Sequence, residues 1–207
     1  MANLVSVSRL LLVGLVIWIA YQPPSLWQLT AVPVLIVAFV TDALDGYLAR
    51  ARGEASVFGA MLDIAVDRIV ELSLWVVLVD LKLVGVWVPL VFIVRGSLVD
   101  AIRGGESSRQ GVAPFDTVGS RFGRWLVKSQ FMRVFYAVLK AVAFCWLLLI
   151  LPFPSVFPDF WGEWSGLLEG IGAALVWASV LVCVARGLPV VVEALARQRR
   201  KPAEDGA

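Results

Sequence analysis

Four aspartates stand in segments that are otherwise almost wholly apolar, where an isolated carboxylate costs about 3 kcal/mol. Asp42 and Asp45 are three residues apart, and Asp63 and Asp67 are four apart. In a helix, either spacing places the two carboxylates of a pair on one face. Four carboxylates gathered between two helices repel one another strongly unless cations neutralise them. The pattern therefore predicts a site that binds divalent cations.

Small and basic residues surround these aspartates. Gly46 follows Asp45 directly, and Gly59 comes four residues before Asp63. The missing side chains let a ligand or a neighbouring helix approach closely, and Arg50, one turn after Gly46, is suited to a phosphate. The chain has no histidine, so we expect oxygen ligands and a cation such as Mg²⁺, Mn²⁺ or Ca²⁺. The alternative, solvated charges at a membrane interface, explains neither the spacing nor the glycines.

One continuous stretch contains all of these residues. It reads Asp42-x2-Asp45-Gly46-x2-Ala49-Arg50-x8-Gly59-x3-Asp63-x3-Asp67. It resembles the signature of the CDP-alcohol phosphotransferase (CDP-alcohol phosphatidyltransferase) family, with all eight defining positions matched. The resemblance implies a membrane enzyme in which two divalent cations, Mg²⁺ or Mn²⁺, bridge the aspartates and the diphosphate of the donor.

The resemblance also implies a role for each residue of the motif. Asp42, Asp45 and Asp63 are expected to be the main metal ligands, and Asp67, beside the metals, the catalytic base. The residues expected to bind the CDP group are Asp42, Gly46, Ala49, Arg50 and Gly59, together with Asn3 and Ser6. Asn3, Ser6 and Arg9 resemble the family's amino-terminal Asn-x-x-Thr/Ser-x-x-Arg pattern.

A second set of matches bears on the acceptor alcohol. Phosphatidylglycerophosphate synthases of this family have two segments that are matched in part here, by Arg95, Arg103, Gly123, Arg124 and Gln130. Other residues of these segments differ, namely Gly96, Asp100, Leu126 and Val127. The complete motif thus indicates the CDP-linked donor, while the acceptor depends on this second, incomplete pattern.

Basic residues near the ends of the fourth and fifth apolar segments indicate an anionic acceptor, because a phosphate needs one or two cationic side chains. The candidates are Arg95, Arg103, Arg121, Arg124 and Lys128. Arg95 is singled out because it lies within an apolar run. The others also fit the excess of basic residues found on the cytoplasmic side of membrane proteins. Lys140 lies deeper, where it can snorkel, pair with an acid or face a dimer cleft, and we predict no catalytic role for it.

Membrane-spanning helices must position these residues. Of the 207 residues, 60% are hydrophobic, against about 45–50% in soluble domains, and a spanning helix needs about 20 apolar residues. We expect an all-α integral membrane fold whose six transmembrane helices enclose a polar, metal-binding cavity near the cytoplasmic face. The predicted spans are Leu4–Tyr21, Leu26–Leu48, Val57–Leu81, Val84–Ile102, Trp125–Leu151 and Ser165–Ala185, with a loop at the prolines of 152–158.

Basic residues also set the expected orientation. Arg50 and Arg52, the polar segment 103–124 and the carboxyl-terminal residues all fall on one side, which the positive-inside rule assigns to the cytoplasm. We expect a multi-pass protein of the inner (cytoplasmic) membrane, with both termini and the active site on the cytoplasmic side. A single six-helix domain, residues 1–185, would precede a basic tail, residues 186–207.

The predicted activity is transfer of the phosphatidyl group from CDP-diacylglycerol to an alcohol, with release of CMP, in phospholipid synthesis. Glycerol 3-phosphate is the first choice of acceptor, and inositol phosphate and serine are alternatives. A donor such as CDP-choline with diacylglycerol as acceptor suits this short chain less well. A divalent cation transporter is the alternative from another class, but its carboxylates should lie near the bilayer midplane. The expected partners are the lipid bilayer and a second copy in a homodimer, with no nucleic acid.

Overall fold

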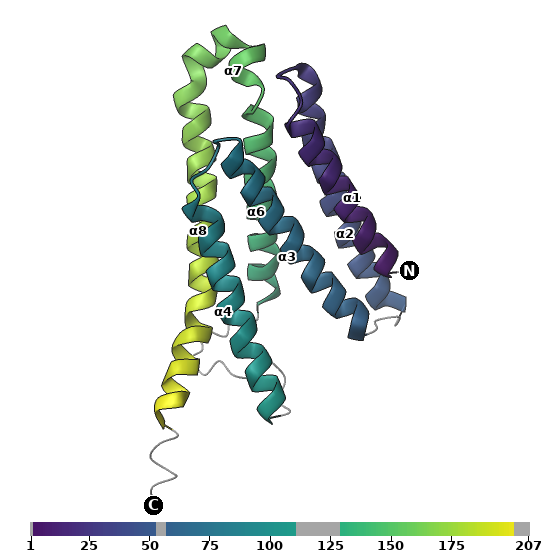
Figure 1. Ribbon diagram of the computed structural model, residues 1–207, viewed down its shortest axis with the longest axis vertical. Helices are drawn as coiled ribbons and strands as arrows, with labels where there is room; N and C mark the ends of the chain where they lie inside the picture. Colours follow the sequence, from purple (N-terminus) through teal and green to yellow (C-terminus); the bar gives the residue numbers. More distant parts are fainter. Residues whose placement is uncertain (1, 53–56, 111–128, 201–207) are drawn as a thin grey trace, which may run out of the picture. The chain divides into compact units, whose positions relative to one another are not determined.

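The computed structural model describes residues 2–52, 57–110 and 129–200, and within these ranges it contains helices and no strand (Figure 1). The helices are α1 (Ala2–Ala20), the 3-10 helix η1 (Leu26–Thr30), α2 (Ala31–Arg52), α3 (Val57–Asp80), α4 (Trp87–Gln110), α6 (Gln130–Ile150), α7 (Phe153–Val156) and α8 (Pro158–Arg200). For residues 2–7, 42–52, 57, 58, 60, 103–110 and 197–200 the description covers the helix and not the side chains. The all-α prediction is confirmed.

Two compact units make up the chain. The first consists of residues 1–86 and 141–175, and the second of residues 87–140 and 176–207. Helices α6 and α8 each contribute one part to the first unit and one part to the second. The motif that spans Asp42 to Asp67 lies wholly in the first unit.

In the first unit, α1 packs against both α2 and α3. Helix α1 runs antiparallel to α2, and α3 reverses direction again (Figure 1). Residues at helical spacing form the buried faces, namely Val13, Val16 and Ala20 of α1, Leu35 and Ala38 of α2, and Val66, Val70, Leu74 and Leu78 of α3. The fully buried Trp75 of α3 packs against Phe144 of α6, with 4.5 Å between the ring centroids. These contacts fix α1 and α3 relative to each other.

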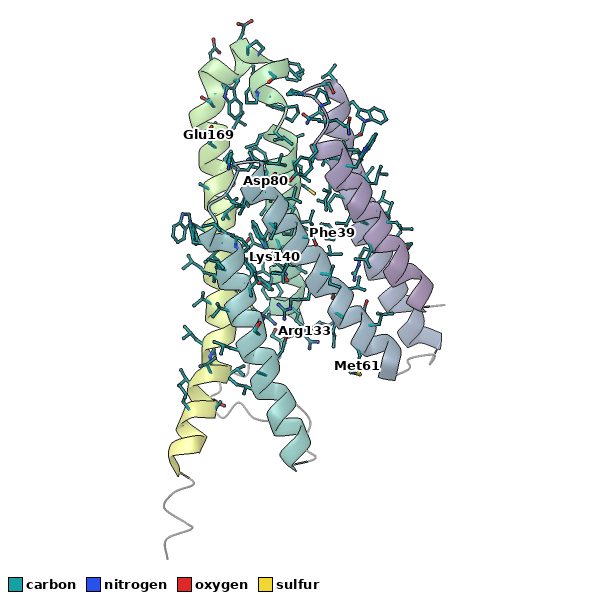
Figure 2. All side chains as sticks on the ribbon, in the orientation of Figure 1. Phe39, Met61, Asp80, Arg133, Lys140 and Glu169 are labelled. Carbon is teal, nitrogen blue, oxygen red and sulfur yellow. The ribbon has the colours of Figure 1, made fainter. Side chains whose placement is uncertain are left out.

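The turn between α1 and α2 is held by a buried glutamine. Nε2 of Gln28 donates hydrogen bonds to the carbonyl oxygens of Ala20, at 3.0 Å, and Gln22, at 2.7 Å. These carbonyls lie at the end of α1, where no helical N–H remains to bond them. At the same end of this unit, the hydroxyl of Tyr21 donates to Asp80 at 2.7 Å. Asp80 lies at the opposite end of α3 from Met61 (Figure 2), so the ends of α1 and α3 are joined far from Asp63 and Asp67.

The second unit combines α4 with the beginning of α6 and the last part of α8. Val99 of α4 and Val190 of α8 are both buried, and Ile102 packs against them. Trp87 at the start of α4 lies over Trp177 of α8, with ring centroids 4.7 Å apart. The core of this unit is therefore built chiefly between α4 and α8.

Two stretches in the described ranges are long and apolar enough to cross a membrane. Gln130–Val156 has a mean hydropathy of 2.4 over its most apolar window, and Pro158–Ala196 has 2.2. Shorter apolar helical stretches lie at Ser8–Ala20 and Leu26–Thr41. The structure thus bears out membrane-capable helices by length and composition, while the count of six spans stays a prediction.

Several element bounds differ from those predicted. Leu26–Thr30 forms a 3-10 turn, so the second long helix begins at Ala31 instead of Leu26. The proline loop contains the short helix α7, and Pro158 begins the next helix, because proline is tolerated in a first turn where its missing N–H has no partner.

The largest difference concerns the last helix. The predicted span ended at Ala185, but α8 continues to Arg200. Arg186 is only 8% exposed and Val190 only 5%, so the buried face continues where a polar tail was expected. Pro189 lies inside this helix and leaves the carbonyl of Ala185 without its usual helical donor.

Candidate functional site

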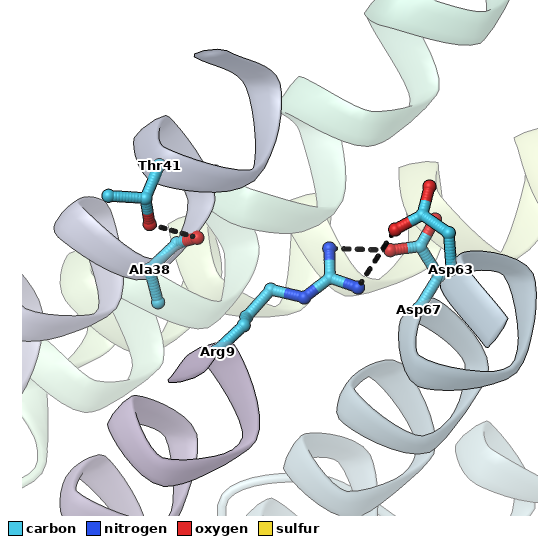
Figure 3. A network of polar contacts seen from close by, with 5 residues as sticks. All are labelled: Arg9, Ala38, Thr41, Asp63 and Asp67. Atoms are coloured by element: carbon cyan, nitrogen blue, oxygen red, sulfur yellow. Dashed lines mark hydrogen bonds and ion pairs between the residues drawn. The ribbon is translucent and has the colours of Figure 1, made fainter. Parts of the chain in front are cut away.

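A buried arginine meets two aspartates of the predicted motif. Nη1 of Arg9, on α1, lies 2.6 Å from Oδ1 of Asp67, and its Nη2 lies 3.8 Å from Oδ1 of Asp63 (Figure 3). The side chain of Arg9 is 4% exposed, whereas those of Asp63 and Asp67 are 53% and 58% exposed. The structure therefore brings these two carboxylates together at a cation while leaving each of them accessible.

The helical repeat explains this meeting. Arg9 precedes Val13, Val16 and Ala20 at intervals of four, three and four residues, and all four side chains are buried. It therefore occupies the face of α1 that faces the core. On α3, Asp63 and Asp67 continue the face that contains Val70 and Leu74. Because α1 packs against α3, residues on these two faces must meet.

The other half of the motif lies on α2. Asp42, Asp45, Gly46, Ala49 and Arg50 all fall within this helix, and their side chains are outside the described part of the structure. The same holds for Asn3 and Ser6 on α1. Gly59 lies in the first turn of α3. Both aspartate pairs thus fall within helices, as the prediction from their spacing requires.

Thr41 marks where the apolar part of α2 gives way to the motif. Its hydroxyl donates to the carbonyl oxygen of Val37 at 2.7 Å, and to that of Ala38 at 3.1 Å (Figure 3). Such bonds satisfy a hydroxyl within the helix, and they often bend it slightly. Ala38 is fully buried, so the acidic segment begins one turn after a tightly packed point.

The chemistry of the donor set fits hard divalent cations. Among the side chains that the structure describes, no group of three or more histidine, cysteine or acidic residues gathers. Two of the four expected carboxylates, those of Asp63 and Asp67, are among the described side chains. They lie one helical turn apart, and each is about half exposed. Carboxylate oxygens without imidazole or thiolate are the set that Mg²⁺ and Mn²⁺ prefer.

Arg95, the first candidate for the acceptor, packs against a glycine in the second unit. A Cβ atom on Gly187 of α8 would lie 2.7 Å from Cγ and 3.2 Å from Nε of Arg95. Glycine at this position therefore makes room for the arginine side chain. Nε of Arg95 is buried and has no hydrogen-bond partner among the described residues.

Two more cations of the second unit contact one aromatic ring. Nζ of Lys140 lies 4.3 Å from the centroid of the Tyr136 ring, and Cζ of Arg186 lies 5.6 Å from it. Lys140 and Arg133 both lie on α6 (Figure 2). A ring face attracts a cation through its quadrupole, and more strongly where water is excluded. Lys140 thus has an aromatic partner, which the sequence-based alternatives of snorkelling, acid pairing and a dimer cleft did not include.

The side chains of the remaining acceptor candidates lie outside the described part of the structure. Arg103 lies on α4, but its side chain is not described. Arg121, Arg124 and Lys128 lie between the described ranges. Their role as acceptor ligands remains a prediction.

Sequence reasoning missed two arginines. Arg9 was identified only as part of an amino-terminal pattern, although its spacing to Val13 and Val16 places it on a buried face. Arg186 was assigned to the start of a polar tail, although Cys183 and Val190 flank it at helical spacing and all three are buried. In both cases the signal was a basic residue in register with apolar neighbours.

Comparison with known families gives one match over most of the chain. Residues 1–185 match the CDP-alcohol phosphatidyltransferase family. This range includes the motif and the ion pair of Arg9 as well as Arg95 of α4.

The similar proteins described next have one of two enzyme names. A CDP-diacylglycerol--glycerol-3-phosphate 3-phosphatidyltransferase of Pseudomonas fluorescens is 36% identical over 104 residues, 49% of this chain and 53% of that protein. The protein of the same name from Escherichia coli strain K12 is 28% identical over 183 residues, 86% of this chain and 90% of that protein. A cardiolipin synthase (CMP-forming) from Streptomyces coelicolor is 33% identical over 118 residues, 54% of this chain and 53% of that protein. The Pseudomonas and Streptomyces alignments thus span only about half of those relatives.

The geometry at Arg9 predicts unequal effects of two matched substitutions. Asp67→Asn removes the charge that lies 2.6 Å from the buried guanidinium, whereas Asp63→Asn removes one at 3.8 Å. We expect Asp67→Asn to lower the free energy of unfolding by about 1–3 kcal/mol, between the values for surface and buried pairs, and Asp63→Asn by less than about 1 kcal/mol. Tryptophan fluorescence during denaturant unfolding in detergent, without divalent cations, measures both. An equal or reversed order would contradict the geometry.

Proposed function

Because the chain belongs to the CDP-alcohol phosphatidyltransferase family, we propose that it transfers the phosphatidyl group of CDP-diacylglycerol to glycerol 3-phosphate and releases CMP. The observation that carries the proposal is the complete eight-position motif between Asp42 and Asp67, within the range that matches the family. Two relatives with aligned sequences are named for this donor and this acceptor. The family makes the chain an enzyme of phospholipid synthesis, in place of the cation transporter considered above.

The four aspartates are proposed to hold two divalent cations, Mg²⁺ or Mn²⁺. Asp42, Asp45 and Asp63 would be the principal ligands, with Asp67 beside them. When bound, the cations supply positive charge that neutralises the diphosphate of the donor. The half-exposed carboxylates of α3 support this assignment, because a ligand must reach them from outside the core.

Asp67 is proposed to act as the general base. Its carboxylate accepts the proton of the acceptor hydroxyl as that oxygen attacks the phosphorus of the phosphatidyl group. The bond from this phosphorus to the oxygen of CMP breaks, and CMP leaves with the electron pair. A positioned base of this kind contributes about 10²–10⁴ to the rate.

The donor nucleotide is proposed to bind against α2 and the start of α1 and α3. Gly46, Ala49 and Gly59 leave space for the cytidine nucleotide, and Arg50 contacts a phosphate. Asn3 and Ser6 complete this set. The proposal rests on the family motif and on the placement of these residues on helices of one unit.

The acceptor phosphate is proposed to bind Arg95. Its buried Nε atom and its position against Gly187 support this choice. Arg186 follows Cys183 by one turn on α8 and precedes Gly187 directly, and it shares the ring of Tyr136 with Lys140. Arg103, Arg121, Arg124 and Lys128 are further candidates on sequence grounds.

A lipid acceptor is a second candidate, and the similarity to a CMP-forming cardiolipin synthase favours it. The acceptor would then be an alcohol that already carries a phosphodiester, such as phosphatidylglycerol. Arginines would again bind the phosphate, so the residues of the second unit are compatible with either choice. Inositol phosphate and serine remain alternatives within the family.

The membrane arrangement proposed here has six spans, with both termini and the active site on the cytoplasmic face of the inner membrane. Basic residues on one side of the predicted spans support this orientation. A single catalytic domain over residues 1–185 agrees with the extent of the family match. A homodimer is proposed by analogy with the family.

Metal removal and loss of Asp67 should both stop the reaction. With CDP-diacylglycerol and glycerol 3-phosphate, we expect CMP release that EDTA abolishes and Mg²⁺ or Mn²⁺ restores.

Asp67→Asn should lower turnover at least about 100-fold, as expected for a lost general base. Asp80→Asn is the matched control, because Asp80 lies at the other end of α3 and bonds Tyr21. Full turnover by Asp67→Asn at normal expression would refute the assigned base.

An acceptor screen tests the substrate assignment. Purified protein with CDP-diacylglycerol and Mn²⁺ is offered glycerol 3-phosphate, phosphatidylglycerol, inositol phosphate or serine, one at a time. We expect CMP release and a phosphatidyl product with glycerol 3-phosphate. Turnover with another alcohol alone would reject this acceptor while keeping the family chemistry. CMP release with none of them would reject the proposed function.

A methyl group at Gly187 should impair acceptor binding. In Gly187→Ala the new Cβ would meet Cγ of Arg95 at 2.7 Å, so the arginine must move away from its present position. We expect the KM for the acceptor to rise about 10-fold, the effect of one weakened charge-assisted hydrogen bond, with the KM for CDP-diacylglycerol unchanged.

Gly166→Ala is the control for the effect of alanine on helix stability, because it lies in the same helix with nothing within 4 Å of its Cβ position. A rise in acceptor KM for both variants, or for neither, would count against the proposed role of Arg95.

A further inference from the structure

We propose that Arg9 is a positioning residue for catalysis, which holds one oxygen of Asp67 and thereby orients its carboxylate for the acceptor hydroxyl. The inference rests on the proposed function, since it assigns a partner to the proposed base. Arg9 lies on α1 and forms ion pairs with Asp63 and Asp67. The juxtaposition that carries it is the contact between Arg9 and the acid pair of α3 (Figure 3).

The burial of Arg9 carries a free-energy cost. A guanidinium removed from water costs several kcal/mol unless it is paired and hydrogen-bonded. An apolar residue would fill the same place on the buried face of α1, beside Val13 and Val16, without this cost. A structural role alone therefore does not account for an arginine that is 4% exposed.

The side chain of Arg9 extends toward the acid pair of α3. Arg9 could meet any acceptor along the face of α3, yet its two terminal nitrogens reach the two aspartates of the motif. Those aspartates are more than half exposed, so water would otherwise solvate them. The arginine is thus the partner that depends on the pair for burial, and the carboxylates are the groups that it holds in place.

Arg9 lies closer to Asp67 than to Asp63. Nη1 contacts Oδ1 of Asp67 at 2.6 Å, within the range of a charge-assisted hydrogen bond, while Nη2 is 3.8 Å from Oδ1 of Asp63. The close contact restrains the rotation of the Asp67 carboxylate. Catalytic bases are commonly oriented by a third group in this way. The planar guanidinium fixes direction, which an ammonium on a flexible stem does not.

The test measures kcat and KM for substitutions at Arg9. Arg9→Met keeps an unbranched side chain of similar length without the charge, and Arg9→Lys keeps the charge without the planar donors. Loss of a group that orients a reactive side chain costs about 10–100-fold. We expect this loss in the kcat of Arg9→Met, a KM for CDP-diacylglycerol within about twofold of wild type, and intermediate activity for Arg9→Lys. Lys82→Gln, at an exposed lysine of the α3–α4 turn, controls for net charge.

Chemical rescue separates positioning from folding. Arg9→Gly leaves space beside the two carboxylates, and we expect millimolar guanidinium to restore turnover in a saturable manner, with no effect of urea. Tryptophan fluorescence during thermal unfolding reports whether each variant is folded. A normal kcat in folded Arg9→Met would overturn the proposal. So would a lost kcat that follows the loss of folded protein and is not rescued by guanidinium.

Two further outcomes have distinct meanings. If Arg9→Met keeps full kcat and reaches half-maximal activity at a lower Mn²⁺ concentration, Arg9 merely occupies the carboxylates, and the positioning role is wrong. If the wild-type chain releases no CMP with any acceptor, the proposed function falls and the role of Arg9 in it falls too. An active wild type with an unaffected Arg9→Met overturns the inference alone.

Discussion

A guanidinium cannot lie within an apolar helix packing without an anion beside it, and this constraint links the first helix to the third. Arg9 is among the least exposed side chains of α1, and it forms ion pairs with Asp63 and Asp67 of α3. The faces of α1 and α3 must therefore keep one register, because a shift by one turn would separate the charges. Val16 of α1 and Leu74 of α3 are buried where these two helices pack, and they keep the same register by shape. Charge and packing thus specify one arrangement together.

The cations of the two units have different neighbours. In the first unit, Arg9 is paired with carboxylates that are themselves half in solvent. In the second unit, Lys140 and Arg186 lie against the ring of Tyr136, and the stem of Arg95 fills the space at Gly187. An aromatic face attracts a cation through its quadrupole, whereas a carboxylate attracts it as an opposite charge.

The sequence predicted most of the elements because their signals are local. Spacing alone put the two aspartate pairs on helix faces, and runs of apolar residues located the cores of α1, α2, α3, α4 and α6. Composition could not locate the end of α8, because Arg186 and Gly187 resemble the start of a polar tail when the burial of Val190 is not known. The same limit applied to Arg9. A basic residue near a terminus looks solvated until the packing of α1 on α3 shows that its neighbours face the core.

The length of α8 has a mechanical consequence. At about 1.5 Å per residue, its 43 residues extend over roughly 65 Å. A bilayer with its headgroups is about 40–45 Å thick, so if α8 crosses one in the orientation proposed above, several turns at its carboxyl-terminal end would extend into water. That end carries Arg197, Arg199 and Arg200. It would stand as a basic stalk that anionic headgroups attract at its base, and the tilt of the last helix would then respond to the charge of the surrounding lipid.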